Sequence, residues 1–423
     1  MTMWSKSRTA ARAVRLVAVF CLGEVLAMSG FALVPVLLPR FTADWGLSAT
    51  EGGWLGGVFF LGYVAAVPVL VAATDKRDAR RVYLGATLVS GASLLLFALW
   101  ARDFVPALLC WMGAGLGLAG TYMPGLRALT DRLDPAHQSR GTAFYTATFG
   151  VGAGLSYLLA EGAQRLFDWP WLFAIAGGAV LAAGALVAWG AGPRPALQAG
   201  APEGVAAPVA VHDDGWRGVL RDPRILAYCG GYLGHNWELF GFRAWLVSYL
   251  GWLHAAEPSA LTAMPGVAAA VATFCAVPAS ILGNEGAHRW GRQRWLARVM
   301  PLSALVALVV AGFGGAGLGV ESGTGMGGAL TVVVLVLYAA TMSLDSATLT
   351  AGLITGTDPG RRGKALALYS CLGFLGAFIG PVAFGMALDA FGRDHPAGWA
   401  GGFATLALAV LLGWAALVRR PLT

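Results

Sequence analysis

Twelve apolar segments recur along this chain, and each is long enough to cross a bilayer, which takes about 20 helical residues. Soluble domains have about a quarter of their residues charged, whereas only 12% of this chain is charged and 57% is hydrophobic. A lone segment in lipid satisfies its backbone hydrogen bonds only as a helix, so the sequence predicts an all-α membrane protein with twelve transmembrane helices. The expected limits are 13–38, 48–73, 82–101, 104–130, 141–163, 169–190, 224–253, 259–282, 295–318, 326–355, 364–390 and 398–418.

The basic residues predict how the chain sits in the membrane. Of the 29 Lys and Arg residues, 23 fall in tails and loops on the side of both chain ends, and 4 fall in loops on the other side. The remaining 2, Arg127 and Arg243, lie within spans. Because cytoplasmic loops are enriched in Lys and Arg, this ratio predicts an inner-membrane protein with both termini in the cytoplasm.

One stretch separates two sets of six spans. Residues 191–222 are rich in Pro, Ala and Gly and then in charged residues, and they contain no apolar run of spanning length. Such a composition is typical of a linker. The sequence therefore predicts an N-terminal six-helix bundle over 1–190, a cytoplasmic linker over 191–222 and a C-terminal six-helix bundle over 223–423.

The loops of the two halves match each other. The loop after span two, 75–81, and the loop after span eight, 288–294, are both short and basic. The loops after spans four and ten both read Asp-Pro and then Arg-Gly, at 134–135 and 140–141 and again at 358–359 and 362–363. Matched loops at matched positions indicate a parallel internal repeat, whose pseudo-twofold axis runs along the membrane normal.

This pattern resembles the major facilitator superfamily over essentially the whole chain. The family's signature is a Gly-x-x-x-Asp-Arg-x-Gly-Arg-Arg loop between spans two and three, with an echo between spans eight and nine. Here Asp78 takes a usual glycine position in the first copy, and His288 replaces the acid in the second. The matching residues are Asp75, Lys76, Arg80 and Arg81 in the first copy and Arg289, Gly291 and Arg292 in the second.

The resemblance implies the family's fold, in which two six-helix bundles surround one central pathway. It also implies that the two signature loops gate the cytoplasmic side. A simpler interpretation is that the loop charges only determine topology. The departures from the signature leave the subfamily open.

Ionisable side chains inside the spans are candidates for transport, because each is costly in lipid unless it faces a partner or a wet cavity. They fall on spans one, four, seven and ten, and the resemblance implies that these four helices line the central cavity. The candidates are Glu24 in span one, Arg127 in span four, His235, Glu238 and Arg243 in span seven, and Asp345 in span ten.

Span seven has the equipment of a proton-coupled carrier. His235 and Glu238 are three residues apart and share a helix face, and such a pair in a low-dielectric cavity can titrate near neutral pH. The alternative is a hydrogen-bonded pair that only fixes span seven against span one. Arg243 faces another way, towards the side of Asn236.

The other candidates have open roles. Asp345 lies on a polar stripe of span ten and can bind a cation, take a proton or pair with an arginine across the cavity. Glu24 is too deep to reach the surface, so it serves transport or forms a structural salt bridge. Arg127 is expected to pair with Asp131, but if it reaches the cavity it can clamp an anion together with Arg243.

The sequence gives no sign of an enzyme. It has no Walker loop, no catalytic triad and no metal cluster, and its five cysteines lie in apolar stretches without ligand spacing. The Gly-rich run at 115–120 matches a dinucleotide pattern, but it lies inside an apolar span. We therefore expect no cofactor, no metal ion and no nucleic-acid partner.

These features predict a secondary active transporter that moves a small solute by alternating access, coupled to protons, with an organic anion favoured. We expect a functional monomer in the lipid bilayer. A drug or organic-cation/proton efflux antiporter is the alternative, although the Gly-Pro that such carriers have in span five is absent. Spans two and eight lack the arginines of the nitrate carriers. A non-transporting sensor or scaffold, or a channel, would be a different class.

Overall fold

Every regular element in the described part of the chain is an α-helix. The computed structural model describes residues 3–192, 215–315, 326–358 and 360–419. The first bundle consists of α1 (Met3–Ala27), α2 (Leu33–Trp45), α3 (Ala49–Lys76), α4 (Ala79–Trp100), α5 (Phe104–Thr130), α6 (Pro135–Ala163) and α7 (Trp169–Gly190). The second bundle consists of α8 (Gly215–Arg221), α9 (Pro223–Ala256), α10 (Pro265–Trp290), α11 (Arg292–Gly315), α12 (Met326–Met342), α13 (Ser346–Gly356), α14 (Arg362–Phe391) and α15 (Pro396–Val418).

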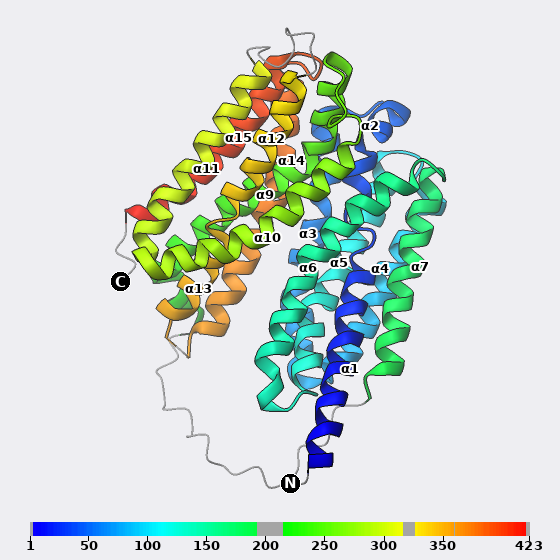
Figure 1. Cartoon of the computed structure of the whole chain (residues 1–423), viewed down its shortest axis with the longest axis vertical. Coiled ribbons are helices and arrows are strands. Elements are labelled where there is room, and N and C mark those ends of the chain that lie inside the picture. Colours follow the sequence, from blue (N-terminus) through cyan, green and yellow to red (C-terminus); the bar gives the residue numbers. More distant parts are fainter. Residues whose placement is uncertain (1–2, 193–214, 316–325, 359, 420–423) are drawn as a thin grey trace.

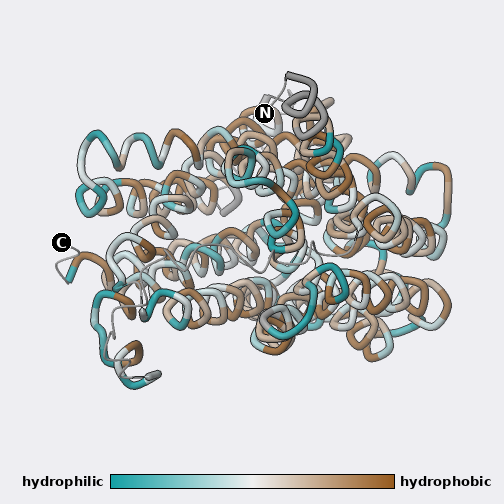
Figure 2. Tube along the Cα trace, turned by 90° about the horizontal axis from the view of Figure 1, so that it is seen from below, coloured by the Kyte–Doolittle hydropathy of each residue, from teal (hydrophilic) through white to brown (hydrophobic). Residues whose placement is uncertain are grey.

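The predicted twelve spans are present. By length and hydropathy, 10 stretches of the described helices can cross a bilayer, with α12 and α13 taken together as one. The α1–α2 pair and α9 supply the other two, and both carry ionisable side chains within the span. Apolar residues dominate the helices, whereas polar residues gather at the connections (Figure 2). The short helix α8 was not predicted, and residues 193–214 of the expected linker lie outside the described residues.

Two predicted spans are interrupted, which corrects the expectation of continuous helices over 13–38 and 326–355. Span one breaks at 28–32, between α1 and α2, and span ten breaks at 343–345, between α12 and α13. Backbone groups at such breaks need partners, because lipid supplies none. Each break lies next to a candidate acid: Glu24 lies in the last turn of α1, and Asp345 precedes α13.

Ser156 of α6 satisfies the break in span one. Its hydroxyl accepts a hydrogen bond from the Ala32 amide at 2.9 Å and donates one to the Ser29 carbonyl at 2.8 Å. In span ten, Trp295 of α11 donates its indole N–H to the Leu344 carbonyl at 3.1 Å. A side chain from a neighbouring helix therefore supports each break.

The two bundles meet along a seam of small residues. α3 packs against α14 and α6 packs against α10, so that helices two and five of each half form the contact. A Cβ atom added to Gly57 would come within 2.5 Å of the Phe378 carbonyl oxygen, and one added to Gly53 would overlap the Pro381 carbonyl. Glycine is required at these positions, because the backbones of the two halves touch.

This seam lies toward one end of the molecule. The bundles converge where α2 lies and diverge toward the end that carries the chain N-terminus (Figure 1). Aromatic rings continue the contact inward: Phe60 lies 4.2 Å from Phe240 and Tyr63 lies 4.3 Å from Phe374, measured between ring centroids. We call the end formed by α2, the start of α3 and the end of α14 the sealed end.

Candidate functional site

The six predicted intramembrane side chains lie in three separate places. Glu24 and Arg127 lie within the first bundle, and Arg243 lies between the bundles. The third group, His235, Glu238 and Asp345, lies within the second bundle.

Glu24 is completely buried beside Tyr145 of α6. The Tyr145 hydroxyl lies 3.1 Å from Glu24 Oε2 and 3.0 Å from the carbonyl oxygen of Thr121. One hydroxyl proton therefore faces two acceptors. A proton on Glu24 would resolve this, because Glu24 could then donate to the tyrosine oxygen while Tyr145 donates to Thr121. The site is thus suited to hold or release a proton.

Glu238 is completely buried inside the second bundle. Its Oε1 atom accepts a hydrogen bond from Ser303 of α11 at 2.7 Å and another from Tyr338 of α12 at 3.0 Å. Its Oε2 atom has no hydrogen-bond partner among the described residues. The carboxyl group is thus held by two hydroxyls, and it forms no ion pair with a cationic side chain among the described residues.

His235 pairs with Asp345 and not with Glu238, its expected neighbour on the helix face. The Nδ1 atom of His235 lies 2.7 Å from Asp345 Oδ1, although the contact lacks the angles of an aligned hydrogen bond. This contact joins α9 to the break in span ten. Asp345 was expected to bind a cation, take a proton or pair with an arginine; in the structure it is paired with a histidine, His235.

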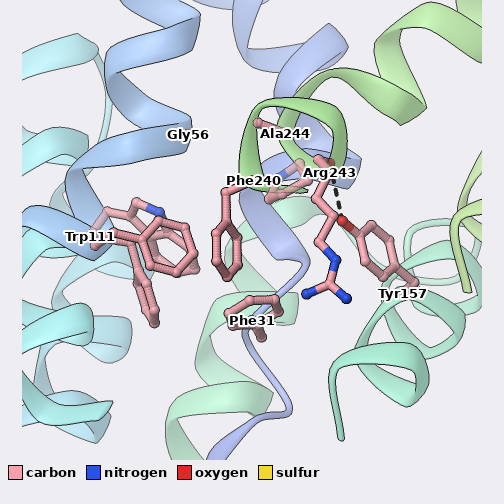
Figure 3. A pocket seen from close by; sticks show the side chains of 10 residues that line it. Phe31, Gly56, Trp111, Tyr157, Phe240, Arg243 and Ala244 are labelled. Atoms are coloured by element: carbon pink, nitrogen blue, oxygen red, sulfur yellow. Dashed lines mark hydrogen bonds between the residues drawn. The ribbon is translucent and has the colours of Figure 1, made fainter. Parts of the chain in front are cut away.

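Arg243 extends from α9 towards Tyr157 of α6, beside the ring of Phe240 (Figure 3). The guanidinium carbon lies 5.6 Å from the centroid of that ring. The Tyr157 hydroxyl donates a hydrogen bond to the backbone carbonyl of Arg243 at 3.1 Å. Asn236 donates instead to the Tyr232 carbonyl, at 3.1 Å. Among the described residues, no carboxylate forms an ion pair with Arg243.

The side chain of Arg243 lines a small cavity between the halves. The cavity volume is about 20 Å³, enough for one water molecule. Neither Glu24 nor Glu238 lies on its wall. The other lining residues are Phe31, Pro35, Gly56, Phe59, Phe60, Trp111, Tyr157, Phe240 and Ala244. A cation is therefore surrounded mainly by aromatic rings from both bundles.

Two tyrosines that the sequence did not single out stack on residues of the site. Tyr122 is half-buried and stacks on Tyr145, with ring centroids 6.0 Å apart. Tyr232 is half-buried and stacks on His235, also at 6.0 Å. The only sequence signal for them was their place on spans four and seven.

Arg127 stays within the first bundle. Its Nη1 atom donates a hydrogen bond to the Thr74 hydroxyl at 2.8 Å, which joins α5 to the end of α3. It is not among the residues that line the cavity around Arg243.

The first signature loop contacts only its own half in the described interactions. Arg80 donates to the backbone carbonyls of Val187 and Ala188 in α7. Asp78 accepts from Arg132 at 2.7 Å and also caps α4, so the departure from glycine has a structural use. Arg132 was not predicted; it is buried.

The remaining matched residues of the first signature loop are Lys76, Arg81 and Asp75. Lys76 and Arg81 are exposed. The side chain of Asp75 lies outside the described residues.

The described side-chain interactions of the second signature loop also stay within its own half. Arg292 donates to the Thr355 hydroxyl at 2.7 Å, within the second half. Gly291 ends α10 with a φ of +84°, a left-handed conformation that favours glycine. Arg289 is exposed, with its guanidinium carbon 5.7 Å from the ring centroid of Trp290.

Curated relatives match parts of the chain. The quinolone resistance protein NorA of Staphylococcus aureus is 27% identical over 150 residues, which cover 34% of this chain and 37% of NorA. The probable L-galactonate transporter of Escherichia coli strain K12 is 25% identical over 218 residues, which cover 49% of this chain and 47% of that protein. The chain thus matches less than half the length of either relative.

Solved structures match the fold along nearly all of the chain. A bacterial homologue of the human lysosomal transporter Spinster, inward-facing and unoccupied, has a TM-score of 0.75 at 16% identity and covers 97% of this chain and 96% of its own. The D-xylose–proton symporter has a TM-score of 0.69 at 13% identity and covers 94% of this chain and 97% of its own.

A family model extends across both halves. The description of that model is the Major Facilitator Superfamily, and it matches residues 20–357. With twelve spans in two bundles and this match over most of its length, the chain belongs to the Major Facilitator Superfamily.

Proposed function

We propose that this transporter is a proton-coupled secondary carrier that moves a small organic anion by alternating access. The observation that carries the proposal is Arg243, a guanidinium enclosed between the two halves without an acidic partner among the described residues. A cation in a place poor in water is stabilised by an anion, and arginine binds a carboxylate through two parallel hydrogen bonds. The solute would supply that carboxylate.

The cavity walls indicate what else the solute carries. Six aromatic residues line the cavity together with Arg243: Phe31, Phe59, Phe60, Trp111, Tyr157 and Phe240. They favour an apolar or planar body attached to the acid group. With room for one water molecule, the cavity must widen as the solute enters. Solute binding is therefore linked to relative movement of the halves.

The buried acids support proton coupling. Glu24 and Glu238 are each held by hydroxyl groups, and neither forms an ion pair with a cation among the described residues. A buried carboxyl group needs a proton or a cation, because an uncompensated charge there is costly. His235 and Asp345 lie close enough to share a proton. We assign these four residues to proton exchange and Arg243 to the solute.

The orientation follows from the loop charges. We propose that the basic loops and both termini face the cytoplasm and that the sealed end faces outward, so that this conformation opens inward. We propose the domain limits 1–190, 191–222 and 223–423, and a functional monomer in the inner membrane. The gating role of Asp75, Lys76, Arg80, Arg81, Arg289, Gly291 and Arg292 belongs to the opposite, outward-open conformation.

Efflux of a drug or an organic cation in exchange for protons is the second candidate. Its support is the partial similarity to NorA, whose name describes quinolone resistance. The aromatic walls also suit a flat cation. The unpaired guanidinium of Arg243 argues against a cationic solute, because like charges would meet in one cavity.

Reconstitution in liposomes tests these functions. The purified protein would be given a panel of organic acids, amines and sugars, and internal pH would be followed with a dye. We expect an organic acid to move protons with itself at a rate that saturates. An amine that moves protons in the opposite direction would establish the antiporter instead. No flux of any panel member would favour a sensor or scaffold, and flux without saturation would indicate a channel.

A further inference from the structure

At the sealed end, an acid of the second half caps a helix of the first half. Asp389 lies two residues before the end of α14 at Phe391. Its Oδ1 atom accepts a hydrogen bond from the Ala49 amide at 2.8 Å, and its Oδ2 atom accepts from the Thr50 amide at 2.7 Å and the Thr50 hydroxyl at 2.6 Å. Ala49 and Thr50 are the first two residues of α3.

The reverse arrangement occurs on the other side of the interface. Glu161 lies two residues before the end of α6 at Ala163. Its Oε2 atom accepts a hydrogen bond from the Gly266 amide at 2.9 Å, and Gly266 is the second residue of α10. Its Oε1 atom accepts from Arg165 of its own half at 3.1 Å.

The two contacts are related by the repeat of the fold. α3 and α10 are the second spans of their halves, and α6 and α14 are the fifth. Each half thus gives one carboxylate and receives one, at the same end of the molecule. The sequence alone predicts only that both acids lie at the outer ends of spans, where their side chains can reach water.

The start of a helix attracts a carboxylate, but Asp389 and Glu161 can reach the helix of the other half only while the two halves are in contact. The first amide groups of a helix have no partner within the helix, and the helix dipole favours an anion there. Close packing brings them into reach: a Cβ atom on Gly266 would lie 2.6 Å from Glu161 Oε2, and one on Gly385 would overlap the Ala49 carbonyl. When the halves part, both carboxylates and all three amides return to water.

We infer that Asp389 and Glu161 are paired latches of the sealed end, and that opening this end to the outside breaks both. The inference rests on the alternating access proposed above. The latches set the balance between the two conformations and do not touch the solute. Their contributions add, because the residues lie in separate contacts and share no partner.

The test measures opening of the sealed end without any solute. Spin labels would be attached at the exposed positions Ala43 and Asp394, one in each half, in full-length protein without its native cysteines, placed in lipid nanodiscs. Pulsed electron paramagnetic resonance then gives the distribution of distances between the labels. The variants are D389N and E161Q, alone and together, because the amides keep the shape but lose the charge and one acceptor.

We expect the ratio of open to closed molecules to rise roughly threefold for each single variant and roughly tenfold for the double variant, because each variant weakens one partly solvent-screened contact and the two effects multiply. E51Q and R165Q are matched controls. Among the described residues, the Glu51 carboxylate bonds only to Ser48 of its own half. R165Q removes the arginine partner of Glu161 but leaves the contact of Glu161 with the Gly266 amide in place. Neither control should change the distances.

An unchanged distribution in a folded double variant would overturn the inference. If the double variant does not fold, the change of Thr50 to Val removes one hydrogen bond to Asp389 and should give a smaller shift in the same direction. The result is separate from the solute panel: shifted distances in a protein that transports nothing would keep the latches and reject the carrier. Transport with unshifted distances would do the reverse.

Discussion

The Nδ1 atom of His235 lies 2.7 Å from Oδ1 of Asp345, and both side chains are almost completely buried. At this distance the contact is attractive when the imidazole is protonated, because the ring is then a cation beside a carboxylate. The contact holds α9 against the break between α12 and α13. It therefore combines a structural role with a place where a proton can reside.

Removing one member of this pair should be more harmful than removing both. H235N or D345N leaves the other group buried without its partner, and we expect each to lower the free energy of unfolding by roughly 3 kcal/mol. The double variant H235N/D345N should lose less than the sum of the two. Thermal unfolding in detergent gives the coupling energy as a double-mutant cycle. Strictly additive losses would show that the two side chains do not interact.

Neutralising the buried acids should separate solute movement from its energy source. In E24Q or E238Q the amide keeps the size of the side chain but cannot release a proton. We expect accumulation of the solute against its gradient to stop, while exchange of labelled for unlabelled solute continues. Both are measured in proteoliposomes, and E285Q, an exposed acid of α10, is the matched control. Proton-driven accumulation that survives in both variants would remove these residues from the coupling mechanism.

Changes at Arg243 should act on solute binding. R243Q removes the charge, and we expect KM for the organic acid to rise about 100-fold, which corresponds to roughly 2–3 kcal/mol for a charge-assisted pair. R243K keeps the charge but loses the two parallel hydrogen bonds, so its KM should lie between those of the wild type and R243Q. Arg298 is an exposed arginine of α11, and R298Q should match the wild type. An unchanged KM in R243Q would place the solute elsewhere.

The break in span one should depend on Ser156. S156A leaves the Ala32 amide and the Ser29 carbonyl without their buried partner, and we expect a loss of about 2 kcal/mol in the free energy of unfolding. S29A is the comparison, because in the described part of the chain the Ser29 hydroxyl makes one long hydrogen bond of 3.5 Å, to the Ala176 carbonyl. Equal melting temperatures for the two variants would mean that the break is stable without Ser156.

The spans were predictable because hydropathy is a property of consecutive residues. Segment 104–130 coincides with α5 (Phe104–Thr130), and 169–190 coincides with α7 (Trp169–Gly190). The breaks were not predictable in this way. The interruption at 28–32 is supported by Ser156, which lies more than 100 positions along the chain, and no window of the sequence contains both.

The side-chain partners of the candidate site residues were also hard to predict, because they lie far away in the sequence. Helical spacing placed His235 and Glu238 on one face, but the packing of α11 and α12 gives Glu238 to Ser303 and Tyr338. His235 is left to Asp345, 110 positions away. The contacts of Glu161 and Asp389 across the interface could not be recognised either, because they are made mainly to backbone amides, which every residue except proline carries.

The glycine seam between α3 and α14 has a mechanical consequence. Where Gly53, Gly57 and Gly385 meet the opposite backbone, a Cβ atom would overlap it, whereas farther inward Tyr63 of α3 packs against Phe374 of α14. Parting of the halves therefore separates bare backbone at the sealed end and aromatic rings farther inward. Larger residues at these glycines would hold the two backbones apart, so we expect them to shift the balance away from the sealed conformation.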